Sequence, residues 1–465
     1  FTNNAGDPDY HQLAGLTYEE NGVKRELNIP KGDILHQFRE DVNNGKLPAV
    51  SWLAGPENFS DHPTAPWYGA WYVSEILDIL TKNPEVWKKT IFILTYDEND
   101  GYFDHIPPFT APDPLNPETG RCSAGIDTSA EYIRREQELA EGVGKKEART
   151  GPTGLGFRVP MVIASPWSRG GHVCSQVFDH TSVFRFVQEL LNKKKGKQIQ
   201  ESTISPWRKT VSGNLTAAFR PYQEGEQEKL PFLEKVPFIE TIFNAKFREA
   251  PSNFKILSAA EIAQIGKDPF SSALMPKQEP GIKPSCALPY QLYADGNLTG
   301  DNKSFQIKME AGNEIFGEQS AGSPYNIYIP VRYAVAGESG KPVSFENTGS
   351  RSYAVIAGDS LTESWPLQSF ENGLYHLRLH GPNGFFREYR GSEKDPDLLV
   401  RCDYERSPLN NRRLSGKLLI IVKNTNKQHT LQLQIRDHSY KAKPVAKRVP
   451  AWSTRKLLLD QSKSF

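Results

Sequence analysis

The sequence lacks the features that mark membrane-spanning and nucleic-acid-binding chains. None of its apolar runs approaches the roughly 20 residues that a transmembrane helix needs. Its 56 basic and 55 acidic residues nearly cancel, which leaves a net charge of +1. This balance removes bulk electrostatics as an argument for nucleic-acid binding. The composition therefore predicts neither a membrane span nor a nucleic-acid partner.

Cysteine is also scarce. The four cysteines are far apart and form no CxxC motif (Cys122, Cys174, Cys286 and Cys402). This spacing predicts neither a zinc knot nor a redox pair. Sparse cysteine suits the cytosol as well as the periplasm, so it does not decide the compartment.

Common catalytic motifs are missing as well. The sequence has no GxSxG elbow, Walker A loop, HExxH helix or Rossmann glycine fingerprint. The pair Gly154 and Gly156 is too short to form a phosphate loop, and the GPNG run at 381–384 is typical of a turn. Any catalytic chemistry must therefore come from another arrangement of residues.

The N-terminus begins Phe-Thr-Asn-Asn, with no initiator Met and no signal peptide. We expect that the protein is processed or that the sequence is a fragment.

Residues 1–222 have the pattern of an α/β fold. Helices are expected where apolar residues recur at helical spacing, at 34–42, 67–80 and 180–191. Strands are expected at short apolar runs, at 49–53, 90–96 and 158–164. The runs at 90–96 (TIFILTY) and 158–164 are apolar on both faces, which is typical of covered strands. Alternating strands and helices predict a mostly parallel sheet.

The segment 113–156 interrupts this pattern with many Pro, Gly and charged residues and a helical patch near 131–141. It is either a solvated insertion or part of an active-site rim, because long loops often carry function.

The remaining sequence changes in character twice. Residues 223–283 are rich in Lys, Glu and Pro, which predicts a linker or extended arm. From 284 onward, short strand-like runs alternate with Gly and Asn turns, at 290–294, 304–309, 325–329, 353–356 and 374–379. A weak internal repeat divides this part into β domains at 284–392 and 393–465, and the second copy stops at Phe465 where a strand should begin.

The strongest chemical signal is the run 96–101. The strand TIFILTY places Asp97 and Glu98 at its carboxyl end, where open α/β sheets bind ligands. Two adjacent carboxylates in a turn can hold a divalent cation, and Gly101 allows a sharp turn behind them. The alternative is a polar strand end without chemistry.

Three histidines accompany this run. Asp61-His62 follows the run at 49–53, His105 follows the carboxylates, and His180 precedes a predicted helix. A His beside an Asp can be a metal ligand or a general acid. A lone loop histidine can equally be solvated, and the DHTS run that begins at Asp179 can be a helix cap.

Taken together, these runs resemble bacterial phosphocholine-specific phospholipases C of the alkaline-phosphatase-like phosphoesterase superfamily. The matching runs, in order, are GPENFSDHP (55–63), YDENDGYFDHIPP (96–108), RVP (158–160), SPWS (165–168), DHTSV (179–183), WR (207–208), GNLT (213–216) and GPNGFFRE (381–388). The last resembles the signature of a C-terminal β repeat. The combination covers nearly the whole chain.

The resemblance implies a partial alkaline-phosphatase-like α/β domain followed by all-β, sandwich-like repeat domains. It implies that Asp97 and Glu98 bind a divalent metal ion whose identity is open. It places His62, with Asp61, near the scissile phosphate as proton donor or charge stabiliser, and His105 and His180 as supporting residues. The implied reaction splits a choline phospholipid into diacylglycerol and phosphocholine, and the implied location is secreted or periplasmic in a bacterium.

One part of the family pattern is missing. The family has a Glu-Asn metal-binding pair and a Thr or Ser nucleophile well upstream of the segment that contains Trp52, and only 51 residues precede Trp52 here. We find no candidate for these groups. We therefore expect a proteolytic product or a truncated form that is inactive alone.

Two other functions remain open. One is a broad-specificity acid phosphatase of the same superfamily. The other is a non-catalytic module that binds membranes or glycans through exposed Trp365, Tyr389, Phe385 and Phe386. The alternative is that these rings pack between the β domains. A phospholipid or membrane surface is the expected partner, while headgroup preference and oligomeric state cannot be read from the sequence.

Overall fold

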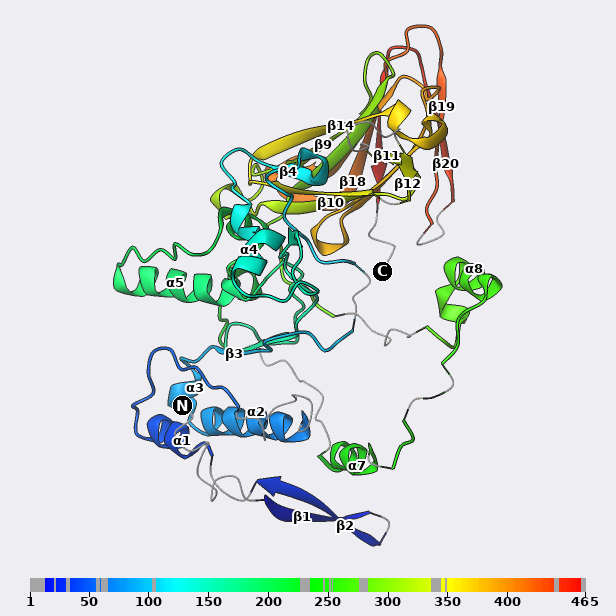
Figure 1. The fold of residues 1–465 in the computed structure, drawn as a ribbon. Coiled ribbons are helices and arrows are strands. Elements are labelled where there is room, and N and C mark those ends of the chain that lie inside the picture. The colour runs from blue at the N-terminus through cyan, green and yellow to red at the C-terminus, as the bar shows by residue number, and fades with distance from the viewer. Residues whose placement is uncertain are drawn as a thin grey trace. The chain divides into compact units, whose positions relative to one another are not determined.

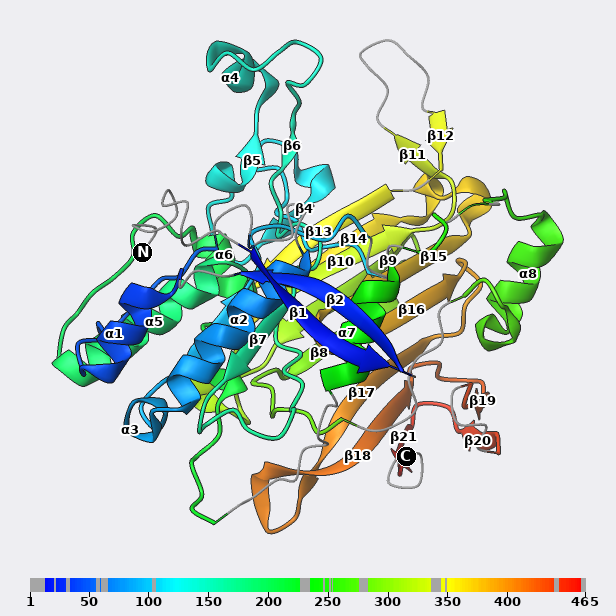
Figure 2. The same ribbon diagram turned by 90° about the horizontal axis from the view of Figure 1, so that it is seen from below.

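The computed structural model of the chain separates into two compact units, each of which is considered by itself (Figures 1 and 2). The structure describes residues 13–20, 22–30, 34–55, 59, 66–102, 106–225, 235–245, 247–250, 252, 254–275, 283–335, 344–347, 349–438 and 443–460. No helix in this part of the chain is long and apolar enough to cross a membrane.

The first unit comprises residues 1–94, 161–172 and 220–284 and is mainly helical. Its strands are the antiparallel hairpin β1 (Leu13–Glu20) and β2 (Val23–Pro30), and the hydrogen-bonded neighbours β3 (Phe92–Thr95) and β7 (Met161–Ala164). Its helices are α1 (His36–Asn43), α2 (Pro66–Thr81), α3 (Pro84–Trp87), α7 (Lys235–Ala245) and α8 (Ala259–Lys267), with a 3-10 turn at Pro269–Ser271.

The core of the first unit lies between α1 and α2, which Figure 1 shows beside each other. Apolar residues three or four positions apart line one face of each helix, as the sequence predicts. The buried members are Leu35, Phe38, Val42, Phe59, Tyr72, Ile76, Ile79 and Leu80. The helices predicted at 34–42 and 67–80 are therefore confirmed.

The strand predicted at 49–53 is wrong. These residues are irregular, and Val50 and Trp52 remain 46% and 54% exposed. An apolar run forms a buried strand only where a neighbouring strand can satisfy its backbone and cover its side chains. The described residues provide no such neighbour for this run.

The strands predicted at 90–96 and 158–164 are confirmed as β3 and β7, but both are shorter than the apolar runs that contain them. All four residues of β3 are half-buried, so the strand is less covered than its composition suggests. The larger parallel sheet stays a prediction.

The second unit comprises residues 95–160, 173–219 and 285–465. Its first part contains β4 (Gly120–Cys122), β5 (Tyr132–Ile133), α4 (Arg135–Ala140), β6 (Gly151–Pro152), α5 (Thr181–Lys195) and α6 (Pro206–Val211), with 3-10 turns at Pro117–Thr119, Ser129–Glu131 and Thr216–Ala218. Strands β5 and β6 pair in antiparallel fashion. The helix predicted at 180–191 is confirmed as α5.

Most of the second unit is β structure. One sheet has the order β16-β15-β10-β13-β4 and another has the order β14-β9-β8. The strands are β8 (Leu292–Leu298), β9 (Ser304–Ala311), β10 (Ser323–Ile329), β13 (Gly349–Val355), β14 (Asp359–Pro366), β15 (Tyr375–His380) and β16 (Phe386–Gly391). A hairpin of β11 (Tyr333–Val335) and β12 (Ser344–Glu346) adjoins them.

These two sheets share one hydrophobic core. Alternate residues of β9 and β15 are buried, which is the pattern of strands with one face turned inward. Side chains from both sheets join the core, including Phe305, Ile327, Trp365 and Leu377. The antiparallel β pattern predicted for this region is confirmed for every pair in these sheets except β4 with β13.

The final strands form smaller sheets. Strands β17 (Leu398–Ser407), β18 (Asn410–Asn424) and β21 (Thr454–Leu459) form one sheet, and β19 (Leu431–Ile435) pairs with β20 (Val445–Val449). The Tyr404 hydroxyl donates to the carbonyl of Leu292 over 3.2 Å, which ties β17 to β8. The predicted division into domains at 222, 283 and 392 stays a prediction.

The aromatic residues predicted as exposed anchors pack instead into the β core. Trp365 is fully buried, and Tyr389 and Phe385 lie against the core cluster. The Tyr389 hydroxyl donates to the carbonyl of Ala294 over 2.8 Å. Of the four predicted anchors, Phe386 alone is largely exposed. The structure therefore favours the alternative in which these rings are packed, because Trp365, Tyr389 and Phe385 contribute to the core.

Strand β4, from the predicted insertion at 113–156, completes a sheet of the β region. It pairs in parallel with β13, and Gly120 lies opposite Ser352. Gly120 has φ = +120°, and a Cβ atom there would lie 1.9 Å from the Ser352 carbonyl oxygen. Glycine is required at this position both by the backbone angle and by the close approach of the neighbouring strand.

We expect Gly120→Ala to weaken this pairing. The clash with Ser352 should cost about 2 kcal/mol more than the left-handed strain alone. Gly125→Ala is the matched control, because Gly125 also has positive φ but no atom lies within 4 Å of the position that a Cβ would take. Chemical denaturation of both variants measures the difference, and equal destabilisation would contradict the steric argument.

A second expectation concerns acid stability. Hydrogen bonds from His376, then Arg378 and Arg390, lower the pKa of Glu388 from 4.5 to about 2. A lowered folded-state pKa contributes stability above pH 4.5 that is lost as pH falls toward 2. Glu388→Gln should therefore reduce the free energy of unfolding at pH 6 and lose less of it between pH 5 and pH 2.5.

The exposed Glu393→Gln variant serves as the control for general acid effects. Urea titrations across this pH range test the idea. A Glu388→Gln curve parallel to that of the unaltered chain would contradict it.

Candidate functional site

The carboxylates predicted as metal ligands lie directly after β3. Asp97 and Glu98 are both exposed. The turn behind them is stabilised by Asp100, whose Oδ1 accepts from the backbone N–H of Tyr102 over 3.1 Å. Gly101 has φ = +82°, the left-handed conformation that the sequence predicts for a sharp turn.

His180 lies next to this turn, just before α5. Its Nε2 is 3.1 Å from the backbone carbonyl oxygen of Asp97. Because a carbonyl oxygen can only accept, His180 donates from Nε2. Two segments separated by about 80 positions in the sequence are thus joined by a hydrogen bond.

Asp179, which precedes the N-cap residue His180, stabilises the start of α5. Its Oδ1 accepts from the Thr181 hydroxyl over 2.6 Å, and its backbone carbonyl accepts from the N–H of Ser182 over 3.0 Å. The His180 side chain makes no cap hydrogen bond. The imidazole is therefore directed to Asp97, while the neighbouring Asp179 carboxylate binds the Thr181 hydroxyl in the first turn of the helix.

The half-buried Arg208 holds Asp179 in place. Arg208 Nη1 donates to Asp179 Oδ2 over 2.8 Å. Its Nε and Nη2 each lie 2.9 Å from an oxygen of Glu131, in a two-point contact. The side chains of Glu131 and Asp179 are each only 4% exposed. The two-point contact gives strong, directional hydrogen bonds, and loss of Arg208 would leave the two shielded carboxylates without a counter-charge.

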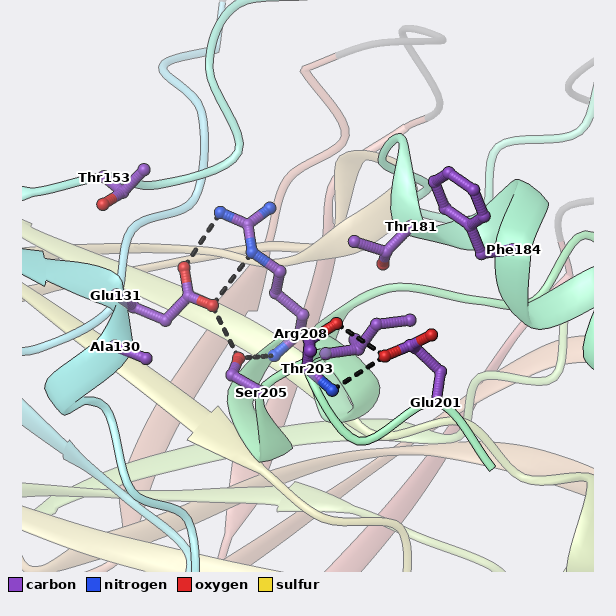
Figure 3. Close-up of a pocket in the computed structure, with 10 residues that line it drawn as sticks. Ala130, Glu131, Thr153, Thr181, Phe184, Glu201, Thr203, Ser205 and Arg208 are labelled. Carbon is purple, nitrogen blue, oxygen red and sulfur yellow. Dashed lines mark hydrogen bonds and ion pairs between the residues drawn. The ribbon is translucent and has the colours of Figure 1, made fainter. Parts of the chain in front are cut away.

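Ser205 completes the cluster, which Figure 3 shows in close-up. Its hydroxyl donates to Glu131 Oε1 over 2.6 Å and accepts from the Arg208 backbone N–H over 3.1 Å, which caps α6. Burial opposes the charged form of Arg208, but hydrogen bonds to Asp179 and Glu131 outweigh it and raise its pKa. The guanidinium therefore stays charged.

A pocket of about 360 Å³ lies over this cluster (Figure 3). Its charged lining side chains are already engaged: Arg208 with Glu131, and Glu201 with the N–H and hydroxyl of Thr203 over 2.9 and 2.6 Å. A charged side chain that is already paired must give up its partner before it can bind a polar ligand, and this costs free energy. We therefore place the candidate site at Asp97 and Glu98 rather than in this pocket.

A metal fits the described residues only in part. Asp97 and Glu98 are adjacent carboxylates, and carboxylate oxygens are the ligands that hard divalent cations prefer. Within the described residues, however, no group of three or more His, Cys, Asp or Glu side chains is placed to hold an ion. The predicted residues Asp61, His62 and His105 lie outside the described residues.

Sequence reasoning missed Glu131 and Ser205 as members of the cluster. Ser205-Pro206 is a recognisable helix start, because Pro favours the first helical position and Ser caps it. No local pattern marks Glu131, which reaches Arg208 from a distant segment. The Trp207-Arg208 run is one of the segments that carry the family resemblance, but the resemblance predicts no role for it.

Comparisons with known proteins identify two families in the chain. Residues 10–192 match the Phosphoesterase family, and residues 284–392 match the bacterial phospholipase C C-terminal domain. The first match contains Asp97, Glu98 and His180. The second contains the core strands of the β region.

Several similar proteins carry the phospholipase C name. The chain is 35% identical over 416 residues to a non-hemolytic phospholipase C of Pseudomonas aeruginosa, which covers 88% of this chain and 52% of that protein. It is 34% identical over 364 residues to a non-hemolytic phospholipase C of Burkholderia pseudomallei, covering 78% and 44%. Phospholipase C A of Mycobacterium tuberculosis is 38% identical over 183 residues, covering 39% and 31%.

The chain thus combines a phosphoesterase region with a phospholipase C C-terminal domain. The resemblance to bacterial phospholipases C is confirmed by both family matches and by these similar proteins. It spans about half the length of the curated relatives from Pseudomonas and Burkholderia.

The buried cluster generates a prediction about stability. Arg208→Met should destabilise the fold by about 3–5 kcal/mol, because it leaves Glu131 and Asp179 buried without a counter-charge. Adding Glu131→Gln should recover part of the loss. Denaturant unfolding of the single and double variants measures both effects.

Arg332→Met is the matched control, because Arg332 pairs with Glu371 at the surface. Its cost should stay below about 1 kcal/mol. Equal losses in the free energy of unfolding for the Arg208 and Arg332 variants would show that the cluster stabilises the fold no more than a surface ion pair does.

Proposed function

We propose that this chain forms part of a metal-dependent phospholipase C that hydrolyses the phosphodiester bond of choline phospholipids. The observation that carries the proposal is the Asp97-Glu98 turn, held by His180 within the phosphoesterase match. The similar proteins that match most of the chain are named phospholipase C. These names support this reaction over broad-specificity phosphate hydrolysis.

The proposed tasks of the residues follow from their chemistry. Asp97 and Glu98 would hold a divalent metal ion, which would polarise the phosphoryl oxygens of a bound substrate. His62, with Asp61, would donate a proton to the leaving oxygen or stabilise charge on the phosphate. His105 would support the site. His180 would fix the direction of the Asp97 turn through its contact with the backbone carbonyl.

The finer fold and location are parts of the same proposal. We assign residues 1–222 to an alkaline-phosphatase-like domain, 223–283 to a linker, and 284–392 and 393–465 to two sandwich-like β domains. The bacterial origin of the relatives supports a secreted or periplasmic protein, because choline phospholipids are reached most directly from outside the cell. A phospholipid or a membrane surface would be the partner.

Two forms of the protein test the proposal. One is this chain alone. The other is a chimera in which the chain replaces the matched part of the non-hemolytic phospholipase C of Pseudomonas aeruginosa. Both are assayed with p-nitrophenyl phosphocholine and with p-nitrophenyl phosphate, each with and without Mn²⁺, Zn²⁺, Mg²⁺ or Ca²⁺.

We expect metal-dependent turnover of the phosphocholine ester by the chimera and none by the chain alone, since the sequence offers no nucleophile candidate. Asp97→Asn should lower the chimera's rate by at least about 100-fold, as removal of a key electrostatic group does in other enzymes. Asp100→Asn, two positions from Glu98 and facing Arg158, is the control and should keep most of the rate.

The other outcomes separate the alternatives. Preference for the phosphate monoester would indicate an acid phosphatase. A folded chimera whose rate is unaffected by Asp97→Asn would refute the assignment of the site.

A further inference from the structure

Two cysteines that are far apart in the sequence lie on neighbouring backbone segments. Val173 and Ser285 form a parallel β-bridge, and the N–H of Cys286 donates to the carbonyl of Val173 over 2.9 Å. Because parallel segments advance together, the residues that follow the bridge, Cys174 and Cys286, are also opposite each other.

The two thiols interact directly. Cys286 is 8% exposed and Cys174 is half-buried. The pKa of the Cys174 thiol is raised, first by burial and further by the neighbouring Cys286 thiol, although the backbone at Gln176 opposes the rise. Both sulfur atoms thus lie in the same small, poorly solvated space.

The spacing of paired backbone segments suits a disulfide. Neighbouring strands lie about 4.7–4.9 Å apart. Disulfides join Cα atoms that are about 4.4–6.8 Å apart. A bond between Cys174 and Cys286 would therefore need little movement of the backbone.

Further contacts hold the segment that follows Cys174. The backbone N–H of Val177 donates to the Tyr290 hydroxyl over 3.1 Å. The carbonyl of Val177 accepts from the N–H of Gly213 over 2.8 Å. The turn from 173 to 177 is thus held on both sides before the chain reaches Asp179 and His180.

We propose that Cys174 and Cys286 form a disulfide that joins the turn before His180 to the beginning of the β region. No CxxC motif or sequence proximity marks this pair, so the proposal comes from the fold alone. It is independent of the proposed phospholipase activity.

The bond forms by exchange with a small disulfide such as oxidised glutathione. The thiolate of one cysteine attacks the glutathione disulfide and releases one glutathione thiolate, which leaves a mixed disulfide on the protein. The second cysteine, as thiolate, attacks the protein sulfur and releases the second glutathione. The two cysteines lose two electrons and two protons; the electrons reduce the glutathione disulfide, and its two released thiolates take up the protons.

The consequence is a redox-dependent constraint on the segment that leads to the candidate site. In the oxidised form, the bond closes residues 175–285 into a covalent loop. A long closed loop lowers the entropy of the unfolded chain. The bond also limits local opening of the turn at 173–177, and through it the freedom of His180 relative to Asp97.

Peptide mapping tests the proposal. The full chain is equilibrated with oxidised glutathione, alkylated, and digested with trypsin without reduction. We expect peptide 170–185, which contains Cys174, to be linked to peptide 278–303, which contains Cys286, and thiol counting to fall from four to two. Dithiothreitol should restore four thiols. Because the Cys174 pKa is raised, the bond should form faster at pH 8.5 than at pH 6.5.

Variants make the outcome specific. Cys174→Ser and Cys286→Ser should each abolish the linked peptide, whereas Cys122→Ser and Cys402→Ser should leave it intact. Hydrogen exchange of residues 173–185 should be slower in the oxidised chain and unaffected by oxidant in Cys174→Ser.

Four free thiols after oxidation at pH 8.5, or a link that involves Cys122 or Cys402, would overturn the proposal. Neither result would bear on the phosphocholine ester assay. Loss of activity in the chimera with an intact disulfide would, conversely, bear only on the proposed function.

Discussion

The contact on which much of the second unit depends is the guanidinium of Arg208 between Glu131 and Asp179. Three separate stretches of chain meet at this charge: the predicted insertion, the start of α5 and the first turn of α6. Two carboxylates with almost no access to water require a nearby positive charge. Satisfying that requirement fixes where α5 begins, and the beginning of α5 fixes the position of His180 beside Asp97.

Local physics explains which elements the sequence predicts well. The spacing of Phe38, Val42, Ile76 and Leu80 determines a helix face without reference to the rest of the chain, and β-branched runs such as 90–96 favour strands in the same way. The run at 49–53 shows the limit of this reasoning. Its composition suits a strand, but strands need partners, and the partner is a property of the whole fold.

The candidate site shows the same division. The position of Asp97 and Glu98 at a strand end, and the turn at Gly101, follow from sequence and are present in the structure. The proximity of His180 could be inferred only by assuming a sheet edge shared by both segments. Glu131 could not be found at all, because its partner Arg208 is more than 70 positions away and both side chains look like ordinary surface charges in the sequence.

The pairing of β4 with β13 also determines how the β region can be separated from the rest of the chain. A protein that began at residue 285 would keep most strands of both sheets but would lack Gly120–Cys122, so the N–H and C=O groups of β13 on that side would have no partner strand. Unpaired strand edges recruit other chains and lead to aggregation. The domain match that begins at residue 284 therefore does not mark a self-sufficient folding unit in this protein, since one of its sheets is closed by a strand from the phosphoesterase match.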